Sequence, residues 1–115
     1  MNYRNTKIYQ RSLELVRTSH NIIKSLPSGY GFLADQLKRA SASVVLNFAE
    51  GAGKPSPADR RRFFGIARGS AYEVAAAVDV GAELGVIAPA QHEHMLDLCD
   101  HVAAMLTRFA QTVGR

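Results

Sequence analysis

The sequence has little of what would place a chain in an oxidising compartment or in a membrane. Its 115 residues include one cysteine, Cys99, and no tryptophan. A single cysteine excludes a disulfide within the chain. No run of about 18 or more apolar residues is present, which argues against a transmembrane helix. The first residues, MNYRNTKIYQRS, are polar and lack the apolar middle of a signal peptide, so we expect a cytoplasmic protein.

Proline is also scarce, and all four prolines lie in three short segments that contain glycine: 27–31, 51–57 and 85–89. Between these breaks apolar residues recur at helical spacing, and no segment alternates for long enough to indicate a strand. We expect helices over 6–26, 32–50, 57–84 and 89–112, the third capped by Ser56 and ended by Gly85. The prediction is an all-α protein with one domain, 1–115, folded as an antiparallel up-down-up-down four-helix bundle.

Each expected helix has one apolar face, which we predict to point inward. In chain order the inward residues are Ile8, Ser12, Leu15, Ser19, Ile22 and Leu26; Leu33, Leu37, Val44 and Phe48; Phe63, Ala67, Ser70, Val74, Ala77, Gly81 and Leu84; and Met95, Leu98, Val102, Met105 or Leu106, Phe109 and Val113. The second helix is apolar on its remaining sides too, at Val45 and Leu46. Because three partner helices cannot easily cover all sides of one helix, these two residues predict a subunit contact.

A polar stripe borders the apolar face of the second helix. Buried polar groups cost about 1–3 kcal/mol each when they lack a partner, so the stripe requires partners on another helix. Ser70 and Glu73, on the third helix, are suitably placed to supply them. We therefore expect a structural polar network between the two helices, formed by Gln36, Ser43, Asn47, Glu50, Ser70 and Glu73.

Catalytic and metal-binding patterns are weak. Glu50 and Glu73 could face each other and hold a metal or share a proton, but neither is followed by the histidine at i+3 that dimetal bundle sites use. A zinc site is conceivable on one face of the fourth helix, from His94, Asp97 and His101, without an evident fourth ligand. The single cysteine has no adjacent base. We expect a protein that is not an enzyme, with no metal and no cofactor.

Charge is distributed unevenly. The net charge is +4; positions 1–68 contain twelve Lys or Arg against four acids, and positions 69–115 contain two against six. This pattern favours a polyanionic partner, or basic and acidic halves that meet in an oligomer. Arg61, Arg68 and Tyr72 share one helix face, which suits phosphate contact and base stacking; a solvated face is the alternative. The candidate nucleic-acid contacts are Arg4, Lys7, Arg11, Lys38, Arg39, Lys54, Arg60, Arg61, Arg62, Arg68 and Tyr72.

Residues on the two central helices resemble the signature of a bacterial four-helix-bundle family. They are Gln36, Ala40, Ser43 and Asn47-Phe48-Ala49-Glu50-Gly51, followed by Phe63, Ala67, Gly69, Ser70 and Glu73. The family includes proteins encoded in intervening sequences of 23S ribosomal RNA genes. It also includes the accessory variability determinant (Avd) proteins of diversity-generating retroelements.

The resemblance implies a homopentameric, barrel-like ring with a positively charged surface. For the Avd branch it also implies binding to a reverse transcriptase and to nucleic acid. The family's basic residue directly after the glycine is not matched, because Ala52 and Gly53 precede Lys54. We expect a non-enzymatic accessory protein that associates with RNA or DNA and with copies of itself. The alternatives are a scaffold that binds a reverse transcriptase and a metal-dependent bundle enzyme.

Overall fold

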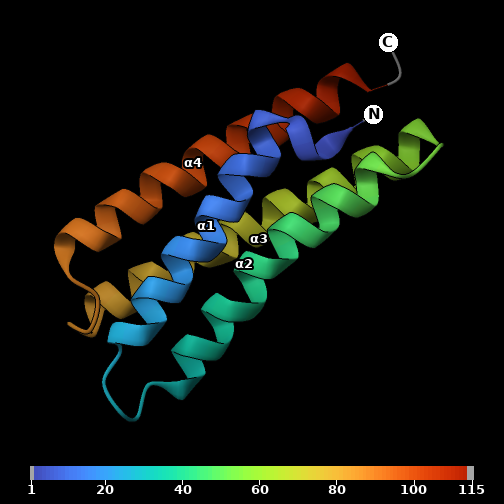
Figure 1. Cartoon of the computed structure of the whole chain (residues 1–115). Helices are drawn as coiled ribbons and strands as arrows, with labels where there is room; N and C mark the ends of the chain where they lie inside the picture. The colour runs from blue at the N-terminus through green and yellow to red at the C-terminus, as the bar shows by residue number, and fades with distance from the viewer. Residues whose placement is uncertain (1, 114–115) are drawn as a thin grey trace.

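The computed structural model describes residues 2–113, which form one 3₁₀ turn and four α-helices and contain no strand. The 3₁₀ turn η1 (Tyr3–Asn5) leads into α1 (Lys7–Ser25), which is followed by α2 (Gly31–Ala52), α3 (Pro57–Glu83) and α4 (Pro89–Thr112) (Figure 1). The helices lie side by side in a molecule of 47 × 21 × 21 Å. The predicted all-α class and its four helices are confirmed. None of the helices in residues 2–113 combines the length and apolarity that a membrane crossing requires.

Local sequence sets the helix ends. The side-chain oxygen of Thr6 accepts a hydrogen bond from the Tyr9 N–H (3.2 Å), and that of Ser56 accepts one from the Asp59 N–H (3.4 Å). Each satisfies a backbone donor that the first turn of a helix leaves free. At the other end of α3, Gly85 adopts φ +74°, a conformation that glycine tolerates better than other residues. The predicted boundaries hold closely, and the largest difference is that α2 continues to Ala52.

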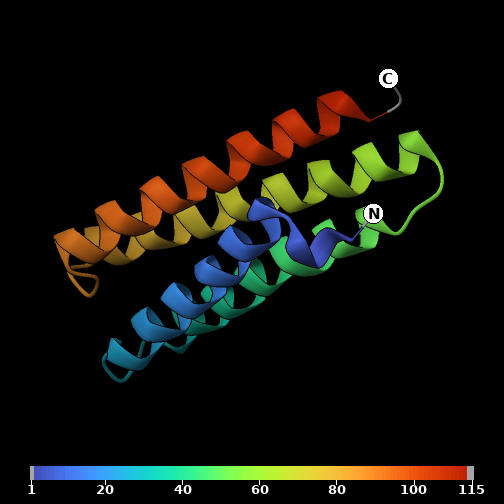
Figure 2. The ribbon, with the colours of Figure 1, turned by 45° about the horizontal axis from the view of Figure 1, so that its top comes forward.

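Figures 1 and 2 show how the helices are joined. Residues at the start of η1, the end of α4 and the α2–α3 connection lie at one end of the molecule, and the other two connections lie at the opposite end. Helix α3 packs closely against both α2 and α4, whereas α1 packs against α2 and more loosely against α4. The seam between α1 and α4 is therefore the most open of the four helix seams.

The core is built from the predicted inward faces of α1, α2 and α4 and from a slightly different face of α3. The Phe48 and Phe64 rings stack, and Phe109 meets both edge-on, with 5.3–5.5 Å between ring centroids; the three rings fill the core near η1. The prediction that Phe63 and Leu84 point inward was wrong, because Phe64 takes the core position and Leu84 is largely exposed. Successive residues are about 100° apart around a helix. A small error in the predicted direction of the inward face therefore assigns the core position to a neighbouring residue.

The sides of α2 differ from the expectation at one residue. Val45 is buried within this chain. Leu46, in contrast, is 66% exposed. Only Leu46 of this pair is therefore available for a contact with another subunit.

Gln36 and Ser43 of the polar stripe of α2 find the predicted partners on α3, whereas Asn47 bonds to Ser43 within α2. The Asn47 amide donates to Ser43 Oγ (2.9 Å), Ser43 and Ser70 share a hydrogen bond of 2.8 Å, and Ser70 Oγ donates to the Ile66 carbonyl (3.1 Å). Because the single Ser70 proton is used toward Ile66, Ser43 is the donor to Ser70. Nearer the other end of the helix pair, Gln36 Nε2 donates to Glu73 Oε2 (3.1 Å).

Glu50 does not belong to this network. Its carboxylate forms an ion pair with Lys54 one turn later, at 3.2 Å. Relative to the Ser43–Ser70 contact, Glu50 lies about 10 Å toward one end of the helix pair and Glu73 about 5 Å toward the other, at 1.5 Å per residue. The two carboxylates therefore do not face each other, and the hypothesis of a shared metal or proton between them was wrong.

Candidate nucleic-acid interface

Charged residues are unevenly distributed along the sequence, and in the folded chain they are also unevenly distributed along the long axis of the molecule. Most of the Lys and Arg residues in 2–113 belong to the parts of the chain where α1 and α3 begin and α2 and α4 end, and these parts lie toward one end of the ribbon (Figure 1). We call this the basic end; its residues are Arg4, Lys7, Arg11, Lys54, Arg60, Arg61, Arg62, Arg68 and Arg108. Two of its acids, Glu14 and Glu50, are in ion pairs with Arg11 and Lys54. The opposite end carries most of the remaining acids, including Asp79, Glu83 and Glu93.

Arg61 and Arg68 are brought together at an exposed groove between α3 and α4. Arg61 Nη1 donates to the Val113 carbonyl (3.2 Å), and Arg68 Nη1 donates to Thr107 Oγ1 (3.1 Å). The groove has a volume of about 290 Å³, and between the two arginines its wall is Gly65, where a Cβ would meet nothing within 4 Å. We call it the α3–α4 groove. It offers two oriented guanidinium groups with an open space between them.

The remaining α3 candidates surround this groove and the start of the helix. Tyr72 is 56% exposed and lies one turn beyond Arg68, as the predicted stripe requires. At the start of α3 the Phe63 ring is flanked by the Arg62 guanidinium, 4.5 Å from the ring centroid, and by Lys54 Nζ, 5.3 Å from it. Arg60, in the first turn of α3, is partly buried. Phe63, expected in the core, thus holds two cations at the surface.

Lys38 and Arg39 lie far from the α2–α3 connection that contains Lys54. They lie about 20 Å along α2 from its end at Ala52, at 1.5 Å per residue. Arg39 instead borders a pocket with Gln36 and Glu73. These two residues therefore do not adjoin Lys54; that they extend the patch of Arg61, Arg68 and Tyr72 stays a prediction.

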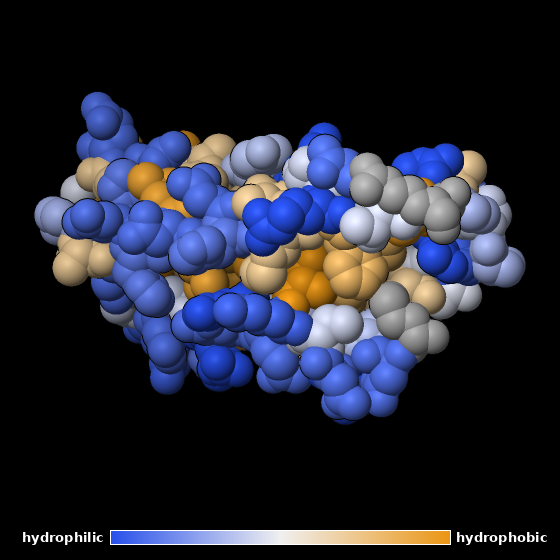
Figure 3. Space-filling view, turned by 90° about the horizontal axis from the view of Figure 1, so that it is seen from above, coloured by the Kyte–Doolittle hydropathy of each residue, from blue (hydrophilic) through white to orange (hydrophobic). Residues whose placement is uncertain are grey.

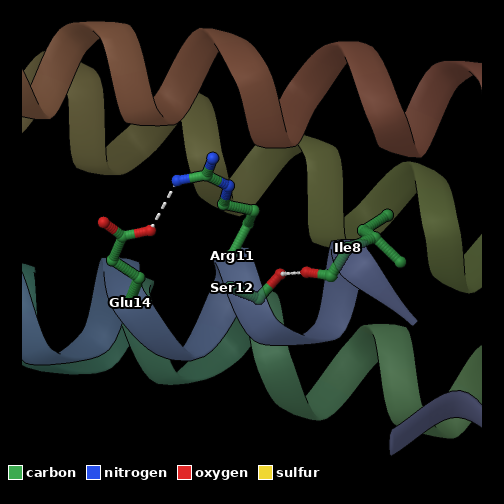
Figure 4. A network of polar contacts seen from close by, with 4 residues as sticks. All are labelled: Ile8, Arg11, Ser12 and Glu14. Carbon is green, nitrogen blue, oxygen red and sulfur yellow. Dashed lines mark hydrogen bonds and ion pairs between the residues drawn. The ribbon is translucent and has the colours of Figure 1, made fainter. Parts of the chain in front are cut away.

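The basic start of α1 meets α4 rather than α3. Lys7 and Arg11 border a groove of about 250 Å³ together with three side chains of α4: His101, Met105 and Arg108. We call it the α1–α4 groove. Figure 4 shows Arg11 and Glu14 on the same side of α1, joined by their ion pair of 2.9 Å. Arg4 lies in η1, just before this helix, and is exposed.

Sequence reasoning missed Arg108 as a candidate contact. The signal was present, because His101, Met105 and Arg108 recur at spacings of four and three and so share a face of α4. It was overlooked because the second part of the chain is acidic overall, and the charge count concealed a basic residue at its end.

The remaining candidates for metal and nucleophilic chemistry lie on α4. His94, Asp97 and His101 are all exposed, and within residues 2–113 no three His, Cys, Asp or Glu side chains come together as a metal site. Cys99 is buried, and its burial, with smaller contributions from Asp100 and Asp79, raises the pKa of the thiol to about 12. A thiol that stays protonated is a poor nucleophile.

Comparison with known proteins gives a fold and a family. The chain is similar to the crystal structure of a protein of unknown function from the S23 ribosomal protein family of Bacteroides thetaiotaomicron VPI-5482. The TM-score is 0.84 and the identity 21%, over 91% of this chain and 99% of the other, a likeness that concerns the fold. No curated protein matches. The model of the family described as 23S rRNA-intervening sequence protein matches residues 4–108. The chain belongs to this family of 23S rRNA-intervening sequence proteins.

Proposed function

We propose that this protein is a non-enzymatic accessory protein that associates with nucleic acid through its basic end. The observation that carries the proposal is the α3–α4 groove, where Arg61 and Arg68 flank an open space that a phosphate group would fit. Arginine matches phosphate in geometry as well as charge. Because the contacts offered are mainly to the backbone, recognition would depend on charge and shape rather than on base sequence.

We propose further that the chain acts as an up-down-up-down protomer of a homopentameric ring. Support comes from the outer surface of α2 and α3, where several large apolar side chains are exposed. Self-association would cover them and remove them from water. They are Phe32, Leu46, Ile66 and Val80. Ring formation would repeat the basic end around one axis and so multiply its contacts with a long polyanion.

Charge reversal in the α3–α4 groove tests the nucleic-acid role. The Arg61→Glu/Arg68→Glu variant is compared with Arg17→Glu/Lys24→Glu, which changes two exposed cations at the same spacing on α1. Binding of a fluorescein-labelled structured RNA and a labelled single-stranded DNA is measured by anisotropy. We expect the first variant to lose at least about tenfold in affinity and the control to lose much less, since phosphate contacts are local. Undiminished binding by the first variant would remove this surface from the proposal.

A scaffold that binds a reverse transcriptase is the second candidate. It is favoured by the same exposed apolar side chains on α2 and α3, which a partner enzyme could cover in place of another subunit. Co-elution of the purified chain with a reverse transcriptase after nuclease treatment would support it. Co-elution that nuclease abolishes would show that nucleic acid bridges the two proteins.

A further inference from the structure

The α1–α4 groove is a second basic surface, and Met105 forms an apolar floor between its cations. We infer that it binds a single-stranded segment of nucleic acid, with phosphates on the cations of its rim and a base against the floor. The inference rests on the proposed association with nucleic acid. It adds a separate site, with its own residues, and a preference for unpaired strands.

The rim of the groove is rich in positive charge. Lys7 and Arg11 come from the first turns of α1, and Arg108 comes from the second half of α4. Arg11 is already paired with Glu14 at 2.9 Å, with both side chains partly exposed. Lys7 and Arg108 are exposed, and no ion pair forms at either among residues 2–113. These two cations are therefore the best placed to bind phosphate.

The floor continues toward the end of α4 in an adjoining pocket of about 270 Å³. This pocket shares Lys7, Met105 and Arg108 with the groove and adds the apolar side chains Ile8 and Phe109. Figure 3, seen from above, shows hydrophobic surface exposed between rows of hydrophilic side chains. The looser packing between α1 and α4 leaves this surface uncovered by the chain itself.

A groove with cations on its rim and apolar side chains on its floor favours nucleic acid whose bases are unpaired. In a duplex the bases expose only their edges in the grooves, so an apolar floor between cations has nothing to stack against. In a single strand every base exposes a face, and stacking on apolar or aromatic side chains tolerates any sequence. Met105 and Phe109 provide that contact, while Lys7 and Arg108 lie within reach of the flanking phosphates.

Anisotropy with two probes tests the inference on the full chain: a fluorescein-labelled oligouridylate of about 12 nucleotides, within the usual site sizes, and an RNA duplex of the same length. Lys7→Gln/Arg108→Gln is compared with Arg17→Gln/Lys24→Gln, and circular dichroism confirms that each variant folds. We expect the first variant to bind the single strand at least about tenfold more weakly at about 50 mM salt, and to lower the slope of log K against log salt by about 0.7 per lost contact. Duplex binding and the control should change much less.

A third variant, Met105→Gln, separates the floor from the rim. It should weaken single-strand binding without changing the salt slope, because it removes stacking and no charge. Unchanged single-strand binding by Lys7→Gln/Arg108→Gln, together with a loss in Arg61→Glu/Arg68→Glu, would overturn the second site and leave the proposed function standing. Equal losses for both probes would overturn the preference for single strands. No binding of either probe by the unaltered chain would overturn both proposals.

Discussion

Two glycines of α3 show how the surroundings decide what a single residue contributes. A Cβ at Gly81 would clash with the buried Ile87 side chain, which crosses over the helix directly after the Gly85 turn. A Cβ at Gly69 would meet nothing within 4 Å. The first glycine is required by close packing, whereas the second only lowers the helix propensity of α3.

Alanine at these two positions should therefore have opposite effects on stability. We expect Gly81→Ala to lower the free energy of unfolding by about 1–3 kcal/mol through overpacking. We expect Gly69→Ala to raise it by about 0.5–1 kcal/mol, the usual difference in helix propensity. Urea denaturation followed by circular dichroism measures both, with Gly69→Ala as the matched control. A stable Gly81→Ala variant would mean that Ile87 can move aside at little cost.

Cys99 should be inert in the folded protein. With a thiol pKa raised to about 12 by burial, almost no thiolate exists at about pH 8, whereas an unfolded cysteine titrates near 8.5. Iodoacetamide should modify the thiol only after urea is added. As the pH rises, the Cys99 thiol loses its proton in the unfolded state before it does so in the folded state. Its contribution to the free energy of unfolding is therefore complete below about pH 8.5 and is lost as the pH rises further. Rapid alkylation without urea would contradict the assigned burial.

At the scale of whole elements, the pairing of α2 with α3 depends on a continuous chain of hydrogen bonds. Removing either hydroxyl of the Ser43–Ser70 pair leaves the other without its partner. We expect Ser43→Ala and Ser70→Ala each to cost about 1 kcal/mol or more, and the double variant to cost less than their sum by about 0.5–1.5 kcal/mol. Ser12 serves as the control, because its hydroxyl bonds to Ile8 within α1. Ser12→Ala with Ser70→Ala should be additive; equal coupling in both cycles would contradict the pairwise assignment.

Sequence patterns predicted these elements better than they predicted the contacts between them. The helix ends follow from local chemistry at Thr6, Ser56 and Gly85, so they could be read directly from the sequence. Ser43 and Ser70 could be paired because each borders the apolar face of its helix, where a hydroxyl group needs a partner. Glu50 could not be placed, because the spacing that groups it with Ser43 on one face says nothing of how far α3 is shifted along α2.

The candidate site could also be predicted from the sequence only where its residues lie on the same helix. Arg61 and Arg68 share a face at a spacing of seven, which the sequence shows directly. Arg108 could join Lys7 only through the contact between α1 and α4, the loosest of the four helix seams and the one between the helices farthest apart in sequence. Pairing distant elements requires the three-dimensional fold, and the interface between them is where the sequence is least informative.

At the scale of the whole molecule, the exposed apolar surface of α2 and α3 should control assembly. Leu46, 66% exposed on this surface, is the residue that a neighbouring subunit would bury. We expect Leu46→Glu to shift the protein from an oligomer to a monomer in sedimentation velocity, because a buried unpaired charge opposes association. Ala104→Glu, at an exposed position on α4, should leave the oligomer intact. Identical assembly of the two variants would exclude this surface as the contact.

The separation of charge along the molecule is the feature on which the functional account depends. A basic end that binds a phosphate backbone releases counterions, so its affinity must fall with salt in proportion to the number of contacts. The direct measurement is the affinity of the unaltered chain for a labelled structured RNA between about 50 and 200 mM salt. With about three phosphate contacts per chain the account predicts a loss of about 40-fold over this range. Affinity that is independent of salt, or no binding at about 50 mM salt, would contradict it.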